Sequence, residues 1–166
     1  MRILVLSDSH GHIERMSLAA KQEMPDAIIH LGDHIGDARK LYTLFPDVAF
    51  YMVKGNCDLN AAGEKELVFM IDNVKIFIAH GHIYNVKASL TSFVYRAREI
   101  CVDVALYGHT HKAAVDWANG IWFMNPGQME RHDGALPATY GIITIENGKI
   151  DVKLKRLEDK PTGAGS

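Results

Sequence analysis

Five apolar runs in this chain end on polar residues, and this pattern constrains the fold more than any other feature of the sequence. Each run has the length of one β-strand and stops, usually at a glycine, on an aspartate, an asparagine or a histidine. The residues at these endings are Asp8 with His10, Asp33, Asn56, His80, and His109 with His111. Because a strand that ends in a short turn delivers side chains to one edge of a sheet, the five endings can converge on one site.

Histidine is unevenly distributed and gathers at the same endings. Eight of the nine histidines lie within three residues of one of them, and His132 is the exception. Aspartate, asparagine and glycine favour turns in any protein, so their presence alone would indicate ordinary turns. The histidines are not explained in that way, and the pattern therefore favours a metal site.

The first half of the chain alternates between short apolar runs and segments with helical spacing. We expect strands at residues 3–6, 27–31 and 48–53 and helices at residues 13–24 and 37–45. Pro25 and Pro46 stop the two helices. This βαβαβ order is typical of a parallel sheet.

The second half is dominated by strands. Asn119-Gly120 and Asn147-Gly148 are two-residue hairpin signals, and Asp72-Asn73 is a weaker one. We expect strands at residues 67–71, 74–79, 102–107, 113–117, 121–124, 140–145 and 149–154, with one helix at 86–101. This number of strands exceeds one sheet of ordinary size. We therefore predict an α/β fold in which two mixed β-sheets pack as a sandwich flanked by helices, four layers in all.

The composition limits the classes of function. With 166 residues, 48% of them hydrophobic, residues 1–157 fit one domain, and the tail at 158–166 is expected to be disordered. A net charge of −2 without a basic block argues against extended nucleic-acid binding. Signal-peptide and membrane-spanning patterns are missing from the sequence, so we expect a cytoplasmic protein. Cys57 and Cys101 alone imply no disulfide framework.

Two pairs of polar residues have the spacing of metal ligands. Asp8 and His10 are two residues apart, as are His109 and His111, so in extended backbone each pair would point to one side. Imidazole together with carboxylate suits Mn, Fe or Zn rather than Ca, and Mg alone fits less well.

The remaining endings complete such a site. Asp33 follows Gly32, which permits close approach of the backbone, and its two carboxylate oxygens make it the natural bridge between two ions. Asn56 would add a neutral oxygen and His80 a further nitrogen.

Five short motifs together resemble those of a known family. They read, in order, Asp8-Ser9-His10, Gly32-Asp33, Gly55-Asn56-Cys57-Asp58, His80-Gly81-His82 and Gly108-His109-Thr110-His111. The set resembles the motifs of the calcineurin-like metallophosphoesterases, in particular the YfcE-like branch of small prokaryotic phosphodiesterases. The resemblance covers residues 1–156 and includes Asn125-Pro126-Gly127, which is similar to a turn of that branch. Each motif alone is weak evidence, but five in order are very specific.

The resemblance implies a site for two divalent metal ions. One ion would take Asp8, His10, Asp33 and His111, and the other would take Asp33, Asn56, His80 and His109. Mn is the expected metal, with Ni, Fe, Zn and Mg as alternatives. Two divalent ions, two carboxylates and a bridging hydroxide leave about one unit of positive charge by simple counting. Such a site would bind a phosphate ester, and the hydroxide would attack phosphorus in line with the leaving group.

Position 57 departs from many members of this family. They have Gly-Asn-His followed by Asp or Glu, and the resemblance gives that histidine the role of proton donor to the leaving group. A thiol, with a reference pKa of about 8.5, is a poorer acid catalyst near neutral pH than an imidazole at about 6.5. We therefore expect a small phosphodiester substrate whose leaving group needs little protonation. The candidate catalytic residues are Asn56, Cys57, Asp58 and His82.

The sequence leaves several alternatives open. The same metal site could serve a phosphomonoesterase or nucleotidase, and the fold could serve as a non-catalytic interaction scaffold, as in the similar retromer subunit. Trp117 and Trp122 could pack in the core or form a surface for a homo-oligomer. We expect His30 to be structural, Asp37 to cap a helix and Cys101 to lie in the core.

Overall fold

The computed structural model describes residues 1–130 and 137–158, and within them the chain forms two five-stranded sheets. The first sheet, ordered β10-β9-β1-β2-β3, contains β1 (Arg2–Leu6), β2 (Ala27–His30), β3 (Ala49–Met52), β9 (Thr139–Glu146) and β10 (Lys149–Arg156). The second, ordered β4-β5-β6-β8-β7, contains β4 (Glu66–Ile71), β5 (Val74–Ala79), β6 (Val104–Leu106), β7 (Ala114–Ala118) and β8 (Ile121–Asn125). The helices are α1 (Ile13–Glu23), α2 (Ile35–Leu44), the 3-10 helix η1 (His82–Tyr84) and α3 (Thr91–Glu99).

The predicted sandwich of two mixed sheets is confirmed. Strands β1, β2 and β3 are parallel, as the βαβαβ order predicts, and β9 and β10 join them in antiparallel pairing. In the second sheet β5, β6 and β8 are parallel, with β4 and β7 antiparallel at the edges. Asp72 and Asn73 have φ angles of 49° and 64°, as a two-residue hairpin turn requires, so even the weaker turn signal was correct.

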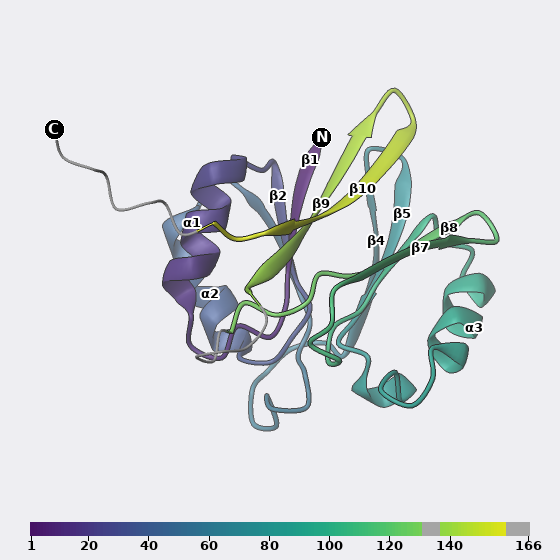
Figure 1. Ribbon diagram of the computed structural model, residues 1–166, viewed down its shortest axis with the longest axis horizontal. Coiled ribbons are helices and arrows are strands. Elements are labelled where there is room, and N and C mark those ends of the chain that lie inside the picture. The colour runs from purple at the N-terminus through teal and green to yellow at the C-terminus, as the bar shows by residue number, and fades with distance from the viewer. Residues whose placement is uncertain (131–136, 159–166) are drawn as a thin grey trace, which may run out of the picture.

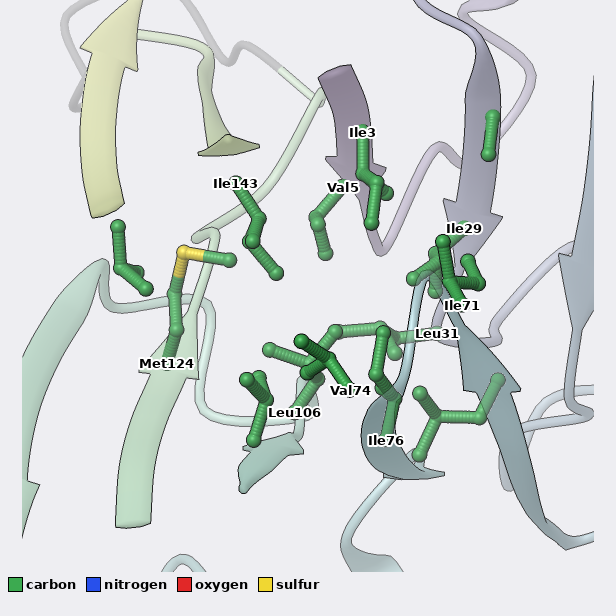
Figure 2. Close-up of a cluster of buried hydrophobic side chains, with 14 of the residues drawn as sticks. Ile3, Val5, Ile29, Leu31, Ile71, Val74, Ile76, Leu106, Met124 and Ile143 are labelled. Carbon is green, nitrogen blue, oxygen red and sulfur yellow. The ribbon is translucent and has the colours of Figure 1, made fainter. Parts of the chain in front are cut away.

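Apolar side chains from both sheets fill the space between them (Figure 2). Ile3, Val5 and Ile143 of the first sheet face Leu106 and Met124 of the second, and all five are fully buried. Burial of each such side chain contributes about 1.5–3 kcal/mol to folding. This layer therefore holds the two sheets in a fixed relationship.

Helices cover the outer faces of the sandwich (Figure 1). Leu4 of β1 packs outward against Met16 of α1 and Leu41 of α2, in a second apolar cluster. Phe93 and Ala97 of α3 pack on the outer face of the second sheet. Successive side chains of a strand point to opposite faces, so Ile3 and Val5 of β1 pack between the sheets while Leu4 packs against the helices.

The helix predicted at residues 86–101 is shorter than expected. Helix α3 begins at Thr91, because Asn85 adopts a left-handed φ of 52° after η1 and turns follow it. Cys101, which we expected in the core, is exposed. It lies beyond the end of α3 at a φ of 52°, where the chain turns towards β6.

Two further expectations concern single residues. Asp37 does not cap a helix, since α2 begins at Ile35 and His34 occupies the position before it. The hairpin of β7 and β8 contributes only one of its tryptophans to the interior, because Trp122 packs against the core between the sheets while Trp117 is 59% exposed.

The end of the described chain packs against the rest of the fold. Leu157 is buried in the cluster that includes α1. Apart from Glu158, the tail that we expected to be disordered lies outside the described residues, as does His132. None of the helices in the described ranges is both long and apolar enough to cross a membrane.

Candidate metal centre

The polar residues at the strand endings lie at one end of the sandwich, where the carboxyl ends of the parallel strands meet (Figure 1). Asp8 and Asp33 follow β1 and β2 of the first sheet. His80 and His109 follow β5 and β6 of the second sheet. The site is therefore shared between the two sheets.

One group of four residues has the arrangement of a metal site. The ligand atoms of Asp8, His10, Asp33 and His111 all lie within 4.8 Å of one another. Nε2 of His111 is 3.1 Å from Oδ1 of Asp8, and Nε2 of His10 is 4.0 Å from Oδ2 of Asp33. Oδ1 of Asp8 and Nε2 of His10 are buried and make no hydrogen bond with any described residue. Buried polar atoms without such a partner are costly, so this donor set fits a metal ion.

A second group surrounds the other oxygen of Asp33. Nε2 of His80 lies 3.5 Å from Oδ1 of Asp33 and 3.1 Å from Oδ1 of Asn56. The ring of His109 is 5.0 Å from that of His80. Asp33 thus presents one oxygen to each group, which is the placement that a bridging carboxylate needs.

The backbone fixes the orientation of His80. Its Nδ1 lies 2.8 Å from the carbonyl oxygen of Leu31, and this oxygen can only accept a hydrogen bond. Nδ1 therefore carries the proton, and Nε2 faces the carboxylates. A hydrogen bond of this kind on the far nitrogen is the usual means by which proteins orient a histidine towards a metal.

The carboxylates of the site are held in their charged form. Burial alone would raise the pKa of Asp8, but contacts with His111 and His80 outweigh it and lower the pKa below its ordinary value. Burial also opposes ionisation of Asp33, yet His80 and the amide of Cys57 lower its pKa. The space between the two carboxylates therefore favours positive charge, whether from protons or from metal ions.

The histidines differ in charge. Burial and the nearby charges of His80 and Lys87 lower the pKa of His109 to about 4, so this imidazole is neutral at pH 7 and has a free lone pair. The contact of its Nε2 with Oδ1 of Asp8 at 3.1 Å raises the pKa of His111. Burial would lower the pKa of His80, but the carboxylates beside it raise it.

Five of the seven candidate ligands have a left-handed backbone. The φ angles are 53° at Asp8, 41° at His10, 58° at Asp33, 68° at His109 and 60° at His111. This region costs a residue other than glycine about 1–2 kcal/mol. The prediction that the two pairs converge through extended backbone was therefore wrong, because tight turns bring them together. Backbone strain of this kind concentrates at functional sites.

A buried chain of hydrogen bonds holds the loop after β1. Nδ1 of His30 accepts from the amide of Gly32 (3.2 Å), which leaves Nε2 to donate to Oγ of Ser9 (3.1 Å). The Ser9 hydroxyl donates to Asp37 (2.9 Å), which also accepts from the amide of Gly11 (2.7 Å). Burial lowers the pKa of His30 to about 4 and keeps it neutral. His30 has the structural role that the sequence indicates, and Asp37 fixes this loop instead of capping a helix.

Asp58, a candidate catalytic residue, ties the loop after β3 to α2. Its carboxylate accepts hydrogen bonds from the amides of Gly55 (2.8 Å) and Ile35 (2.9 Å), and Ile35 is the first residue of α2. The side chain is buried. Both oxygens of Asp58 are therefore engaged with backbone, which is a structural arrangement.

Asn125, at the end of β8, holds the loop after β6. Its Nδ2 donates to the carbonyl oxygen of Gly108 (3.0 Å) and to Oγ1 of Thr110 (2.9 Å). Its Oδ1 accepts from the amide of Gly127 (2.9 Å). Gly127 has a φ of 82°, and a Cβ atom there would lie 2.0 Å from Oγ1 of Thr139. The Asn-Pro-Gly turn therefore requires its glycine.

Cys57 and His82 lie at the rim of the site. Partial burial and the charge of Asp33 raise the pKa of Cys57 to about 11, so the thiol is a weaker acid than a free cysteine. The ring of His82 is 5.5 Å from that of His80, and its buried Nδ1 makes no hydrogen bond with the described residues. Burial and the proximity of His80 lower the pKa of His82.

Glu130 is a residue of the site that the sequence analysis did not identify. Its Oε2 lies 3.9 Å from Nε2 of His10. The amide of Met129 donates to the carbonyl oxygen of Ser7 (3.2 Å), and Arg15 donates to the carbonyl oxygen of Met129 (3.2 Å), so this segment is anchored beside β1. A third carboxylate therefore stands next to the first ligand group.

Comparisons of the sequence with known proteins point to one family. Residues 1–148 match the sequence model of the calcineurin-like phosphoesterase superfamily domain. The probable metallophosphoesterase YsnB of Bacillus subtilis (strain 168) is 35% identical over 154 residues, which cover 92% of this chain and 89% of YsnB. Phosphodiesterase YfcE of Escherichia coli (strain K12) is 25% identical over 168 residues, which cover 86% and 87% of the two chains. The resemblance carried by the five motifs is confirmed.

Solved structures agree with the fold. A conserved uncharacterized protein and predicted phosphoesterase from Streptococcus pneumoniae TIGR4 superposes with a TM-score of 0.77 at 26% identity, over 93% of this chain and 88% of that chain. Vps29 from Entamoeba histolytica in complex with Zn²⁺ superposes with a TM-score of 0.69 at 20% identity, over 95% and 100% of the two chains. At that identity the likeness to Vps29 shows the shared fold alone.

Proposed function

The chain belongs to the calcineurin-like phosphoesterase superfamily, and on this basis we propose that it is a phosphodiesterase that uses two divalent metal ions. The observation that carries this proposal is the position of Asp33 between two groups of metal-ligating side chains. Its Oδ2 faces His10 at 4.0 Å, and its Oδ1 faces His80 at 3.5 Å. We propose Mn as the metal, because the mixed nitrogen and oxygen ligands suit a transition metal.

Each ligand group would hold one ion. Asp8, His10 and His111 would share the first ion with Asp33, and Asn56, His80 and His109 would share the second with it. When bound, such ions activate water and neutralise the charge of the phosphate oxygens. The residues of the chain orient the site: Leu31 fixes the tautomer of His80, and the His30–Ser9–Asp37 chain fixes the loop that carries Asp8 and His10.

Two observations favour diesters over monoesters. The pKa of Cys57, raised to about 11, makes this side chain a poor proton donor to an alkoxide leaving group. Oε2 of Glu130 lies 3.9 Å from Nε2 of His10, so a further carboxylate borders the first ligand group and makes the site less favourable for a doubly charged phosphate. A site with less positive charge binds a singly charged diester in preference to a doubly charged monoester.

Metal analysis combined with substrate profiling tests the proposal. The purified protein is loaded with Mn, Ni, Fe, Zn or Mg, and its hydrolysis of bis(p-nitrophenyl) phosphate is compared with that of p-nitrophenyl phosphate. We expect two ions per chain and a kcat/KM for the diester at least about tenfold higher. A clear preference for the monoester would indicate a phosphomonoesterase. Failure to hydrolyse either compound with any of these metals would favour an interaction scaffold.

A further inference from the structure

A groove of about 370 Å³ begins at His111 and runs between the start of β7 and the paired ends of β9 and β10. We call it the His111 groove, and it is lined by residues 111–113, 137, 139 and 154–156. The side chain of His111 is 38% exposed, so the same imidazole belongs to the first ligand group and to the groove wall. The volume is that of a small-ligand site.

The alternation of β10 determines which charges reach this groove. Leu154 packs against the apolar core between the sheets. Lys155 points to the opposite face, where its Nζ contacts Glu23 at 2.8 Å. Arg156 returns to the face of Leu154 and lies opposite Thr139 in the register of β9 and β10. The charge of Lys155 is therefore compensated outside the groove. Arg156 lines the groove and also the neighbouring pocket that contains Glu23 and Glu158, but it forms no ion pair with a described residue.

Lys112 supplies a second cation at the mouth of the groove. It follows His111 directly and is exposed. Neither Lys112 nor Arg156 forms an ion pair with another residue in the described part of the chain, and the described lining contains no carboxylate. Ala113, Pro137 and Leu154 supply the apolar part of the lining. The groove thus combines an apolar surface with two cations.

We propose that the His111 groove binds the part of the substrate that does not react, and that this part is a nucleoside carrying an additional phosphate group. The apolar part of the lining would accept the planar base, and Lys112 and Arg156 would bind the additional phosphate. Because His111 belongs both to the first ligand group and to the groove wall, the two regions are adjacent, and a phosphodiester at the metal site would place its other end beside the groove. This inference rests on the proposed phosphodiesterase function and names a class of substrate for it.

Three p-nitrophenyl esters separate the contributions of base and phosphate. They are bis(p-nitrophenyl) phosphate, thymidine 5′-(p-nitrophenyl phosphate), and the same nucleotide ester with a 3′-phosphate. All three release p-nitrophenolate, so differences in KM report binding of the rest of the molecule. We expect the 3′-phosphorylated ester to have a KM about tenfold below that of the ester without this phosphate. Raising the salt concentration should reduce this difference, because salt screens exposed charges.

The double variant Lys112→Gln/Arg156→Gln tests the residues themselves. It should remove the advantage of the 3′-phosphate and leave kcat/KM for bis(p-nitrophenyl) phosphate within about twofold of the parent. The variant Lys21→Gln/Lys149→Gln loses the same charge at exposed positions outside the groove and should keep the advantage. Ala113→Asp should weaken binding of the 3′-phosphorylated ester by a different route, since it places a carboxylate in the groove.

A binding measurement separates this inference from the proposed function. Calorimetric titration of the metal-free parent with the 3′-phosphorylated ester should show binding that the Lys112→Gln/Arg156→Gln variant loses. If the ester binds in this way but no diester is hydrolysed, the phosphodiesterase proposal fails, whereas the proposal that the groove binds this ligand is supported. The groove proposal fails if the 3′-phosphate gives the parent no advantage, or if the variant of Lys21 and Lys149 loses that advantage equally.

Discussion

The backbone amide of Cys57 donates a hydrogen bond of 3.0 Å to Oδ1 of Asp33. The residue that stands where many relatives have a histidine is thus fixed through its main chain to the candidate bridging carboxylate, while its side chain remains exposed. A substitution at position 57 therefore changes the group that could donate a proton without changing the turn that positions it.

Cys57→His should extend the range of leaving groups. An imidazole can protonate an alkoxide near neutral pH, and general acid catalysis typically contributes about 10²–10⁴-fold. We expect diesters with alkyl leaving groups to react at least about tenfold faster, while p-nitrophenyl esters change by less than about threefold. The measurement is kcat across leaving groups of increasing pKa, with Cys57→Ser as the control. An unchanged dependence on leaving-group pKa would exclude this role for position 57.

Asp33→Ala should abolish hydrolysis and leave the fold intact. Loss of the shared carboxylate removes a ligand from both candidate groups, and a rate decrease of at least about 10³-fold is expected. Elemental analysis should find fewer than two ions per chain, and circular dichroism should be unchanged. Asp47→Ala, an exposed aspartate before β3, serves as the control. Near-normal activity of Asp33→Ala would overturn the assignment of two metals.

Glu130→Gln should shift the preference between ester classes. The substitution removes a negative charge that lies 3.9 Å from His10, so the site becomes more attractive to a doubly charged phosphate. We expect the ratio of monoester to diester kcat/KM to rise by about threefold to tenfold. Glu130→Asp keeps the charge and should keep the parent ratio. A ratio unaffected by Glu130→Gln would show that this carboxylate does not set the charge of the site.

Gly127→Ala should damage the site through the loop after β6. Both Gly127 and Gly148 have positive φ angles (82° and 76°), but a Cβ at Gly127 would lie 2.0 Å from Oγ1 of Thr139, whereas nothing lies within 4 Å at Gly148. Gly148→Ala therefore measures the backbone cost alone, about 1 kcal/mol. Gly127→Ala should cost clearly more in urea unfolding and should weaken metal binding. Equal costs for both variants would contradict a steric role of Gly127.

Glu23 should make stability depend on pH. Its buried carboxylate contacts Arg2, Lys155 (2.8 Å) and Tyr140 (2.7 Å), and although burial opposes ionisation these contacts lower its pKa from 4.5 to about 2. A lowered pKa stabilises the folded state above the unfolded-state value of 4.5, and this contribution disappears as the pH falls towards 2. The shift corresponds to about 3 kcal/mol.

Urea unfolding between pH 2 and pH 7 measures this contribution. The difference in unfolding free energy between the parent and Glu23→Gln should be largest above pH 5 and should shrink at lower pH. Glu14→Gln, at an exposed position of α1, should give a difference that is small at every pH. A pH-independent difference for Glu23→Gln would show that its effect is packing rather than charge.

The sequence predicted the sheets well because periodicity and turn residues are local signals. The strand at residues 74–79 was correct to the residue, and the Asn147-Gly148 turn joins β9 to β10 as expected. Helix α3 was overestimated, because turns after the left-handed Asn85 occupy the first residues of the predicted helix, whose composition still favours helix. Cys101 is exposed because α3 ends at Glu99 and Cys101 lies in the turn that follows.

The site was predicted from its strand endings, but its construction was not. Four of the candidate ligands named from the sequence lie close together. The left-handed backbone at five of the seven was not anticipated, although aspartate and histidine adopt this conformation more often than most residues. The sequence does not indicate Glu130, because this residue belongs to no motif. It lies near His10 only because the chain folds back towards the site after β8. The His111 groove likewise depends on the register of β9 and β10, which a single sequence does not specify.

The division of the site between two sheets gives the apolar layer of Figure 2 a significance beyond stability. Side chains such as Ile3 and Met124 fill the space between the sheets, and each sheet carries part of the candidate ligand set. The volume of these side chains therefore sets the distance between the two parts of that set. Exchanges of one aliphatic residue for another in this layer could retune metal preference with every ligand unchanged. For the metal site that we propose, substitutions that look conservative would thus give evolution and protein engineering a route to altered metal selectivity.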